Sequence, residues 1–196
     1  RVVTYTWSDV DDQPAGVVQI AHGLAEHGER YDRFARALNA AGFVVHAVDH
    51  RGHGRTANGR LGDFGASGFG GLIADVAQFG AALRARHGGL PVFLFGHSMG
   101  SFAAQAALLD HSSTWSGAVL SGSTALDAFA AAMANAPADG PAGLEAFNAG
   151  FEHRTGYEWL SRDPAEVDAY VANPWCGWDV PADVIPALFE PCLLYT

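Results

Sequence analysis

A serine between two glycines is the stretch of this chain best suited to chemistry: Gly96-His97-Ser98-Met99-Gly100. An apolar, strand-like run at 92–95 precedes it, and a helical pattern of small residues at 101–109 follows. A serine on a tight turn from strand to helix presents its hydroxyl where free N–H groups favour developing negative charge. Side chains two residues to either side would clash in such a turn, which accounts for both glycines. The spacing predicts that Ser98 is a nucleophile, although serine also favours an ordinary helix N-cap.

Alternating strands and helices are expected to position this turn. Periodicity and apolar runs predict strands at 1–7, 16–21, 43–48, 92–95 and 117–121. Apolar residues at helical spacing predict helices over 31–41, ending at Gly42, and over 69–83. The alternation predicts a parallel sheet built from right-handed crossovers, with residues 1–123 as its core.

Residues 124–190 break this alternation. The segment is rich in alanine, is interrupted by six prolines, and contains Trp159, Trp175 and Trp178. We interpret it as a helical cap over the carboxyl edge of the sheet, where ligands bind in such folds. The tryptophans are expected to form the core of the cap rather than a substrate wall. Asp163 before Pro164 is expected to be a helix N-cap.

Composition excludes several classes of function. The chain has 196 residues, 49% hydrophobic and 16% charged, which suits one globular domain and argues against disorder. A net charge of −10 disfavours binding to nucleic acid or, through a basic patch, to an anionic membrane. No apolar run approaches the ~18 residues of a membrane-spanning helix. No signal peptide is seen, so a cytoplasmic location is expected, although the chain opens at Arg1 and not at Met.

Two cysteines and several histidines are candidates for other chemistry. Cys176 and Cys192 are too few for a disulfide framework, and Cys176 is expected to be an inert buried thiol. The spacing of the histidines at 22, 27, 46, 50 and 53 matches no standard zinc pattern, so no metal and no cofactor is expected. We expect these histidines to bond loop carbonyls. Glu26 and His27 are expected to brace their loop rather than to touch substrate.

Three blocks together resemble a known family, the serine α/β-hydrolases. They are residues 21–31 (AHGLAEHGERY), 49–54 (DHRGHG) and 96–100 (GHSMG). Within the family, the nearest branch resembles the monoacylglycerol lipase and lysophospholipase group, and residues 159–170 resemble the cap of its bacterial members. The resemblance implies an α/β-hydrolase fold, a mostly parallel sheet with helices on both faces and a helical cap. It also implies a fatty acyl ester of glycerol or a related alcohol as substrate.

The resemblance further implies an oxyanion hole made by two backbone N–H groups, those of Leu24 and Met99. A glycine-containing loop at a strand end can turn such groups into a cleft, and no side-chain chemistry is required of either residue. One such donor is worth about 3–4 kcal/mol in the transition state. Gly96, His97 and Gly100 complete the predicted nucleophile elbow around Ser98.

The triad acid and histidine of the fold follow the nucleophile in the chain, on later strands. No strand with an aspartate-bearing loop is recognised after Ser123, and the last histidine, His153, falls within the predicted cap. We therefore expect that the last strands and the base lie beyond this chain. The final residues Cys192-Leu193-Leu194-Tyr195-Thr196 match the translated end of a transposon-derived sequencing adapter, so residues 191–196 are expected to be a non-native read-through tail.

The sequence thus predicts a serine ester hydrolase that acts on monoacylglycerol, lysophospholipid or similar esters through an acyl-enzyme. The activity is expected of a longer parent protein, and this chain by itself is expected to be inactive. The expected partner is a small acyl ester, with transient contact with lipid aggregates and no nucleic acid. The alternatives are a peptidase or acyltransferase of the same fold, or a non-catalytic fragment. Acyl-chain length, head group and oligomeric state are left open.

Overall fold

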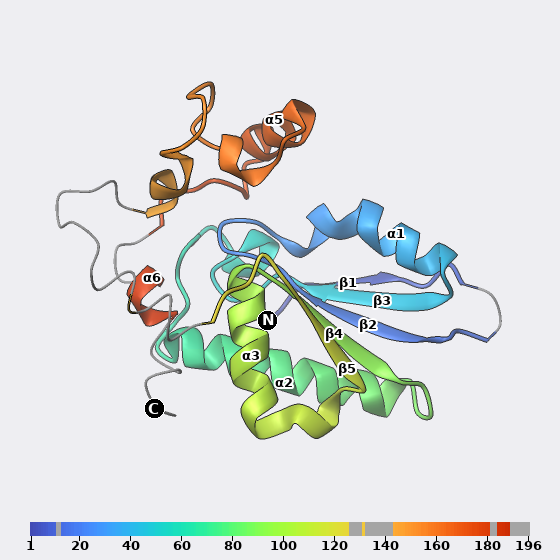
Figure 1. Cartoon of the computed structure of the whole chain (residues 1–196). Coiled ribbons are helices and arrows are strands. Elements are labelled where there is room, and N and C mark those ends of the chain that lie inside the picture. Colours follow the sequence, from blue (N-terminus) through green and yellow to red (C-terminus); the bar gives the residue numbers. More distant parts are fainter. Residues whose placement is uncertain (11–12, 126–130, 132–142, 181–183, 189–196) are drawn as a thin grey trace.

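Five strands form one twisted sheet in the computed structural model of the chain (Figure 1). The structure describes residues 1–10, 13–125, 131, 143–180 and 184–188, so the predicted tail at 191–196 lies outside the described residues. The strands are β1 (Thr4–Trp7), β2 (Gly16–Ala21), β3 (Phe43–Val48), β4 (Val92–His97) and β5 (Gly117–Ser121).

The strand order is β1-β3-β2-β4-β5. β2 pairs in parallel with both β3 and β4, and β4 pairs in parallel with β5. β1 is antiparallel to β3 at one edge. At the other edge of the described sheet, Val119 and Leu120 of β5 are 58% and 41% exposed. The mostly parallel sheet that the sequence predicts is confirmed.

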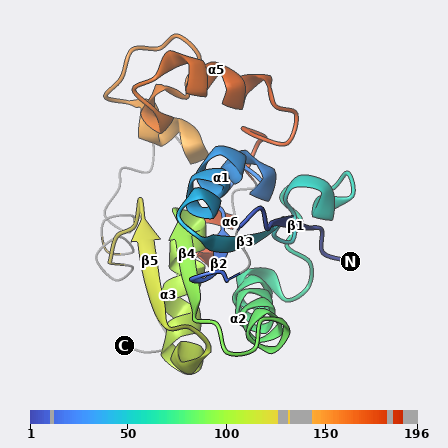
Figure 2. The same ribbon diagram turned by 90° about the vertical axis from the view of Figure 1, so that its right-hand side faces the viewer.

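Helices cover both faces of the sheet (Figure 2). α1 (Asp32–Ala40) lies on one face, and α2 (Gly68–Arg86) and α3 (Met99–His111) lie on the other. The alternation of β2 explains this, because Val18 and Ile20 pack with Ala35 of α1 while Val17 and Ala21 join the larger core beneath α2 and α3. All of β2 is therefore buried.

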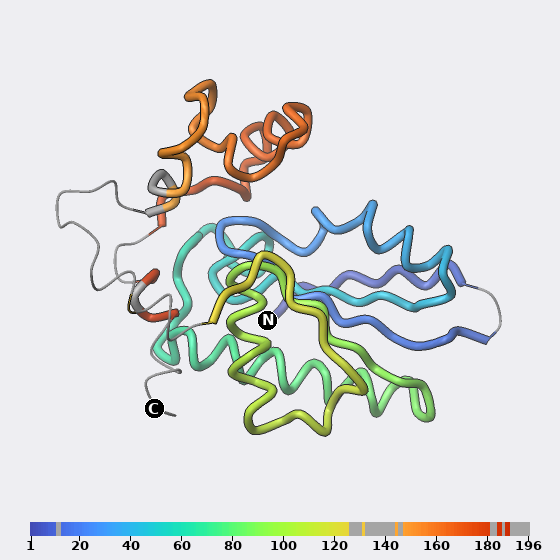
Figure 3. Tube along the Cα trace, viewed as in Figure 1, coloured from blue at the N-terminus to red at the C-terminus, as the bar shows by residue number. Residues whose placement is uncertain are grey.

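Residues 143–180 of the predicted cap segment lie above the loops that follow the strands (Figure 3). They contain 3-10 turns at Gly143–Asn148 and Glu158–Leu160 and the helix α5 (Pro164–Ala172). Asp163 is the N-cap of α5, and its carboxylate accepts a hydrogen bond from the Ala165 N–H at 3.0 Å, as predicted. The short helix α6 (Val184–Ala187) lies apart from α5 and contacts α2. In the described part of the chain no helix is long and apolar enough to cross a membrane.

The observed elements differ from the predicted ones mainly at their ends. Strands 16–21, 43–48 and 117–121 have the predicted bounds. The first strand begins at Thr4 and not at Arg1, and β4 continues through the glycine to His97. The predicted helix at 31–41 begins as a 3-10 turn, Gly28–Tyr31, before α1. β4 is longer because its last residues still pair with β2 and β5.

One polar side chain sits inside the larger core. Gln19 of β2 is 1% exposed, and its side-chain amide donates to the Val76 carbonyl of α2 at 2.9 Å. Its carbonyl oxygen accepts from the Trp115 indole N–H, also at 2.9 Å. Both hydrogen-bonding ends of the Gln19 amide are therefore used, which makes its burial tolerable and links three elements.

We predict that Gln19→Leu lowers the free energy of unfolding by about 1–3 kcal/mol, because it leaves the buried Trp115 N–H without an acceptor. Urea unfolding followed by circular dichroism measures this. Trp115→Phe and the double variant complete a cycle, and the loss in the double variant should be smaller than the sum of the single losses. Additive losses would contradict the coupling.

Candidate active site

Ser98 occupies the turn between β4 and α3 in a conformation that is rare for a residue with a side chain. Its φ is 50° and its ψ is −121°. Its N–H donates to the Ser121 carbonyl of β5 at 2.9 Å. Its carbonyl accepts from the N–H and the hydroxyl of Ser101, at 2.8 and 2.6 Å. The surrounding hydrogen bonds therefore hold a backbone strain that is typical of functional turns.

The two flanking glycines are required by close contacts. A Cβ on Gly96 would lie 2.6 Å from the Gly100 carbonyl oxygen. A Cβ on Gly100 would overlap the carbonyl oxygen of Ala21, the last residue of β2. The predicted reason for the glycines is thus confirmed, and α3 starts directly against the end of β2.

The structure places both residues of the predicted oxyanion hole near Ser98. Met99 is the first residue of α3, where an N–H has no acceptor within the helix. Leu24 follows the end of β2 by three positions and lines the same two cavities as Ser98. The two loops are close, since a Cβ on Gly23 would lie 3.3 Å from the Ser98 Cβ.

Glu26 braces the loop after β2, as predicted, and it also lines the polar cavity beside Ser98. Its carboxylate accepts hydrogen bonds from the Gly23 N–H and the Tyr31 hydroxyl, the latter at 2.8 Å, and forms an ion pair with Arg30. Burial alone would raise the pKa of Glu26, but the nearby Arg30 and the hydrogen bonds hold this pKa below its ordinary value. The carboxylate is therefore charged and fixes the loop.

The cap holds the next part of the same loop. The Ala25 carbonyl accepts from the Tyr170 hydroxyl at 2.8 Å and from the Gly177 N–H at 3.0 Å. Ala25 itself has a φ of 54°, a left-handed value that these contacts support. The side chains of Asn173 and His27 are hydrogen-bonded at 2.9 Å.

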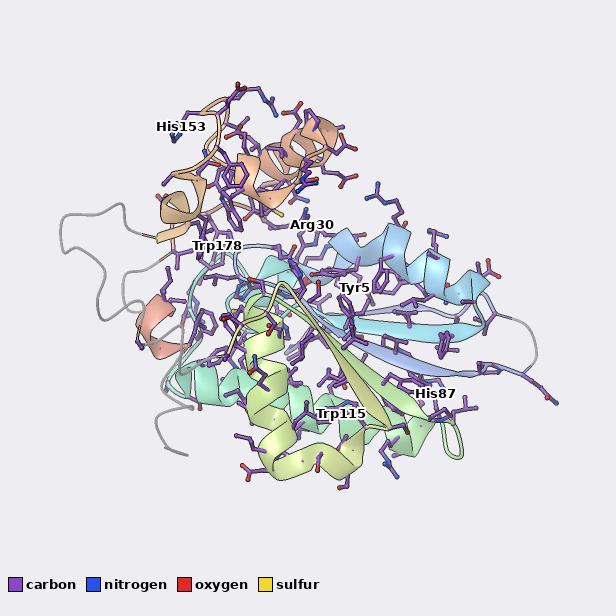
Figure 4. The ribbon with its side chains drawn as sticks, in the orientation of Figure 1. Tyr5, Arg30, His87, Trp115, His153 and Trp178 are labelled. Atoms are coloured by element: carbon purple, nitrogen blue, oxygen red, sulfur yellow. The ribbon has the colours of Figure 1, made fainter. Side chains whose placement is uncertain are left out.

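Arg30 lies where the cap meets the body of the molecule (Figure 4). Its guanidinium carbon is 4.9 Å from the centre of the Tyr170 ring, a cation–π distance. Burial raises the pKa of the neighbouring Cys176 thiol to about 12, even though Arg30 acts to lower it. Cys176 is thus the inert thiol predicted, with a cationic neighbour that the sequence did not indicate.

Three histidines pack together behind the loop, with their rings tilted or edge to face. The ring centre of His22 is 4.2 Å from that of His50 and 5.1 Å from that of His53, and all three are buried. His22 and His53 contact the Gly23 and Arg51 carbonyls, at 2.8 and 2.9 Å, as predicted. The prediction is wrong for His50, whose two ring nitrogens have no hydrogen-bond partner in the described part of the chain. Burial lowers the pKa of His22 to about 4, that of His53 to about 3, and that of His50 well below its usual value.

His46 does not bond a loop carbonyl, which the sequence had predicted. His46 contacts the Thr6 hydroxyl and the His87 ring, both at 2.9 Å, and no loop carbonyl, because it lies within β3. Among the residues that the structure describes, no group of three or more histidine, cysteine or acidic side chains is placed to hold a metal.

Trp159 corrects the expectation that the three tryptophans serve only the core of the cap. It lines both cavities beside Ser98. Trp175 packs edge-on against His27, and Trp178 packs against His53, with ring centres 5.4 and 5.2 Å apart. These two tryptophans therefore cover the loops of the body, a role that only their tertiary neighbours reveal.

Two cavities meet at Ser98, and both are also lined by Leu24 and Trp159. The first, of about 310 Å³, is mostly apolar, and its other lining residues are Met99, Phe102, Gly122, Ser123, Thr124, Leu144, Phe147, Ile185 and Leu188. The second, of about 230 Å³, is polar, and its other lining residues are Gly23, Glu26, Arg30, Arg33, His97, Leu160, Ser161, Glu166 and Tyr170.

The side chain of His97, the residue before the serine, contacts Ser121 of β5. The Nδ1 atom of His97 lies 3.2 Å from the Ser121 hydroxyl oxygen. In the described part of the chain, no hydrogen bond joins a histidine or acidic side chain to the Ser98 hydroxyl. The structure thus brings together the serine and both predicted oxyanion donors, and shows no base beside them within the residues described.

This arrangement defines an α/β-hydrolase. The family model described as serine aminopeptidase, S33 (Hydrolase_4) matches residues 12–192, and the chain belongs to that family. A monoacylglycerol lipase of Mycolicibacterium smegmatis is 35% identical over 191 residues, which cover 89% of this chain and 60% of that protein. The chain thus spans about 60% of the length of this relative.

Solved structures agree with this assignment. A thermostable carboxyl esterase from Bacillus coagulans, in complex with glycerol, has a TM-score of 0.79 and 28% identity, and the match covers 98% of this chain and 67% of that one. A lipase in its open form has a TM-score of 0.75 and 30% identity, over 96% of this chain and 67% of its own. The resemblance to monoacylglycerol lipases is therefore confirmed at the level of the family.

We predict that acid destabilises the fold through its buried histidines, among them the three behind the loop. Below about pH 6.5 the unfolded chain binds protons on His22, His50 and His53 that the folded chain excludes. Above this pH the histidines do not lower the free energy of unfolding. As the pH decreases further, each histidine lowers the free energy of unfolding by up to about 1.4 kcal/mol per pH unit. Urea unfolding between about pH 7 and pH 5 measures this slope above the range in which most carboxylates titrate.

His53→Asn keeps a hydrogen-bond donor near the position of Nδ1. This variant should reduce by about one the number of protons taken up on unfolding, and the pH dependence of the free energy of unfolding should become correspondingly weaker. The exposed His111→Asn variant controls for the loss of a histidine as such. A slope that is unchanged in His53→Asn would show that this histidine is not held neutral in the fold.

Proposed function

We propose that Ser98 is the nucleophile of a carboxylic ester hydrolase that acts on monoacylglycerol, lysophospholipid or a similar ester. The observation that carries this proposal is the meeting of an apolar and a polar cavity at the Ser98 side chain. An ester of a fatty acid and a polar alcohol likewise has an apolar part, the acyl chain, and a polar part, the alcohol, with the reacting carbonyl between them. The name of the mycobacterial relative, a monoacylglycerol lipase, supports the same substrate class.

In the proposed reaction, the Ser98 oxygen attacks the acyl carbonyl and loses its proton to a base. The N–H groups of Leu24 and Met99 stabilise the oxyanion, and the alcohol leaves with a proton. Water then attacks the acyl-enzyme and releases the fatty acid, regenerating the serine. The apolar cavity holds the acyl chain, and the polar cavity beside Glu26 and Arg30 holds the alcohol.

We further propose that the base and the acid that orients it come from sequence beyond this chain. This is consistent with a chain that spans about 60% of its mycobacterial relative and shows no base at Ser98 within its described residues. The chain alone would then bind an ester without turning it over. Removal of one triad member in a serine hydrolase costs up to about 10⁶ in kcat.

A peptidase is the second candidate, because the description of the matching family names a serine aminopeptidase. The fold and the serine turn do not choose between an ester and an amide, since both form a tetrahedral oxyanion. The mostly apolar cavity favours the fatty acyl ester. An acyltransferase would require an alcohol in place of water at the second step.

The proposal predicts hydrolysis of a chromogenic octanoate ester by protein expressed from the gene with any coding sequence that follows residue 190. This activity should fall by about 10⁶-fold, to background, in Ser98→Ala. Ser112→Ala, at an exposed serine, is the matched control and should retain full activity. The chain of 196 residues alone should remain near background.

Two outcomes would contradict the proposal. Turnover by the 196-residue chain that disappears in Ser98→Ala would place a base within this chain. Release of N-terminal residues from a peptide by the longer protein, without cleavage of esters, would favour the peptidase.

A further inference from the structure

The two ring nitrogens of His22 have different partners, and these fix its proton. Nε2 lies 3.0 Å from the backbone nitrogen of His50, and Nδ1 lies 2.8 Å from the Gly23 carbonyl oxygen. A backbone N–H can only donate, so Nε2 accepts and carries no proton. A neutral imidazole has a single N–H, which must therefore be on Nδ1 and donate to the Gly23 carbonyl.

The Gly23 carbonyl and the Leu24 N–H belong to one peptide group. The described chain contains no cis peptide, and in a trans peptide the C=O and N–H point in opposite directions. A carbonyl held toward His22 therefore turns the Leu24 N–H away from His22. Leu24 and Ser98 line both cavities of the site, whereas His22 lines neither of them. In the described part of the chain, no hydrogen bond uses the Leu24 N–H.

We propose that His22 is a positioning residue, which as its Nδ1–H tautomer holds the Gly23–Leu24 peptide with the Leu24 N–H directed at the Ser98 site. His22 touches no substrate and acts through this peptide alone. The catalytic consequence rests on the proposed ester hydrolysis, whereas the tautomer and the peptide orientation do not.

The surroundings of His22 maintain the required neutral form. A charged ring would carry a proton on both nitrogens and would lose the hydrogen bond from the His50 N–H. Burial opposes the charged form, and the buried rings of His50 and His53 pack against His22. Glu26, His27 and Arg30 are the charged or titratable groups that also act on His22, and Glu26 alone of these favours its protonation.

The tautomer can be tested on the chain as it is. Long-range proton–nitrogen NMR spectra of the ¹⁵N-labelled protein at neutral pH distinguish the two neutral tautomers from each other and from the cation. The signals that His22→Asn removes identify His22. We expect a protonated Nδ1 and a bare Nε2. A protonated Nε2, or a charged ring, would overturn the proposal whether or not the protein hydrolyses esters.

Two variants separate positioning from packing. The amide of asparagine can donate from near the position of Nδ1, whereas the amide of glutamine reaches the position of Nε2. In the longer protein, we expect His22→Asn to retain kcat for the octanoate ester within about tenfold. His22→Gln should lose about 10²–10³ in kcat, as when an oxyanion donor is removed, with KM nearly unchanged.

Hydrogen exchange of the Leu24 amide in the 196-residue chain gives a second readout, which should change in His22→Gln and remain near wild type in His22→Asn. Equal kcat and equal exchange in the two variants would overturn the positioning role. If no variant and no wild-type protein cleaves esters, the proposed function fails, and the tautomer and the exchange data still decide this inference.

Discussion

The close approach of α3 to the end of β2 is the constraint on which the site depends. Gly100 lies directly against the Ala21 carbonyl, and Gly96 lies against the Gly100 carbonyl, with no room for a Cβ at either glycine. This contact forces the turn at Ser98 into its left-handed conformation and places the loop that begins at His22 beside it. A bulkier residue at either glycine would separate the serine from the loop that carries Leu24.

The loop after β2 has almost no regular structure of its own, yet each of its parts is held by a different element. Gly23 is held through its N–H by Glu26, and Ala25 is held through its carbonyl by the cap residues Tyr170 and Gly177. His27 is hydrogen-bonded to Asn173. The body and the cap therefore both determine the shape of the predicted oxyanion loop, and the neutral histidines behind it keep charge and water away.

The sequence predicted the parts of the fold that local patterns encode. Continuous apolar runs placed β2 and β3 with their observed bounds, because buried strands tolerate little else. β5 also has its predicted bounds, although Val119 and Leu120 are exposed at the edge of the described sheet. It did not predict that β4 would run through Gly96 to His97, since a glycine reads as a strand end while the pairing with β5 continues. The separate positions of Trp159, Trp175 and Trp178 were also missed, because ring contacts between distant segments leave no local pattern.

By itself, the sequence determined the class of protein, an α/β-hydrolase. Two glycines around Ser98 and the His-Gly pair before Leu24 are short-range requirements of a strained turn and a glycine-containing loop, so they are visible in a few consecutive letters. Only the tertiary structure decided which groups hold these residues in place. Folding brings the partners of His22, Ala25 and Trp159 near from positions tens of residues away. Some of these partners are backbone N–H or carbonyl groups, which nearly every residue carries, so the residue type does not indicate them.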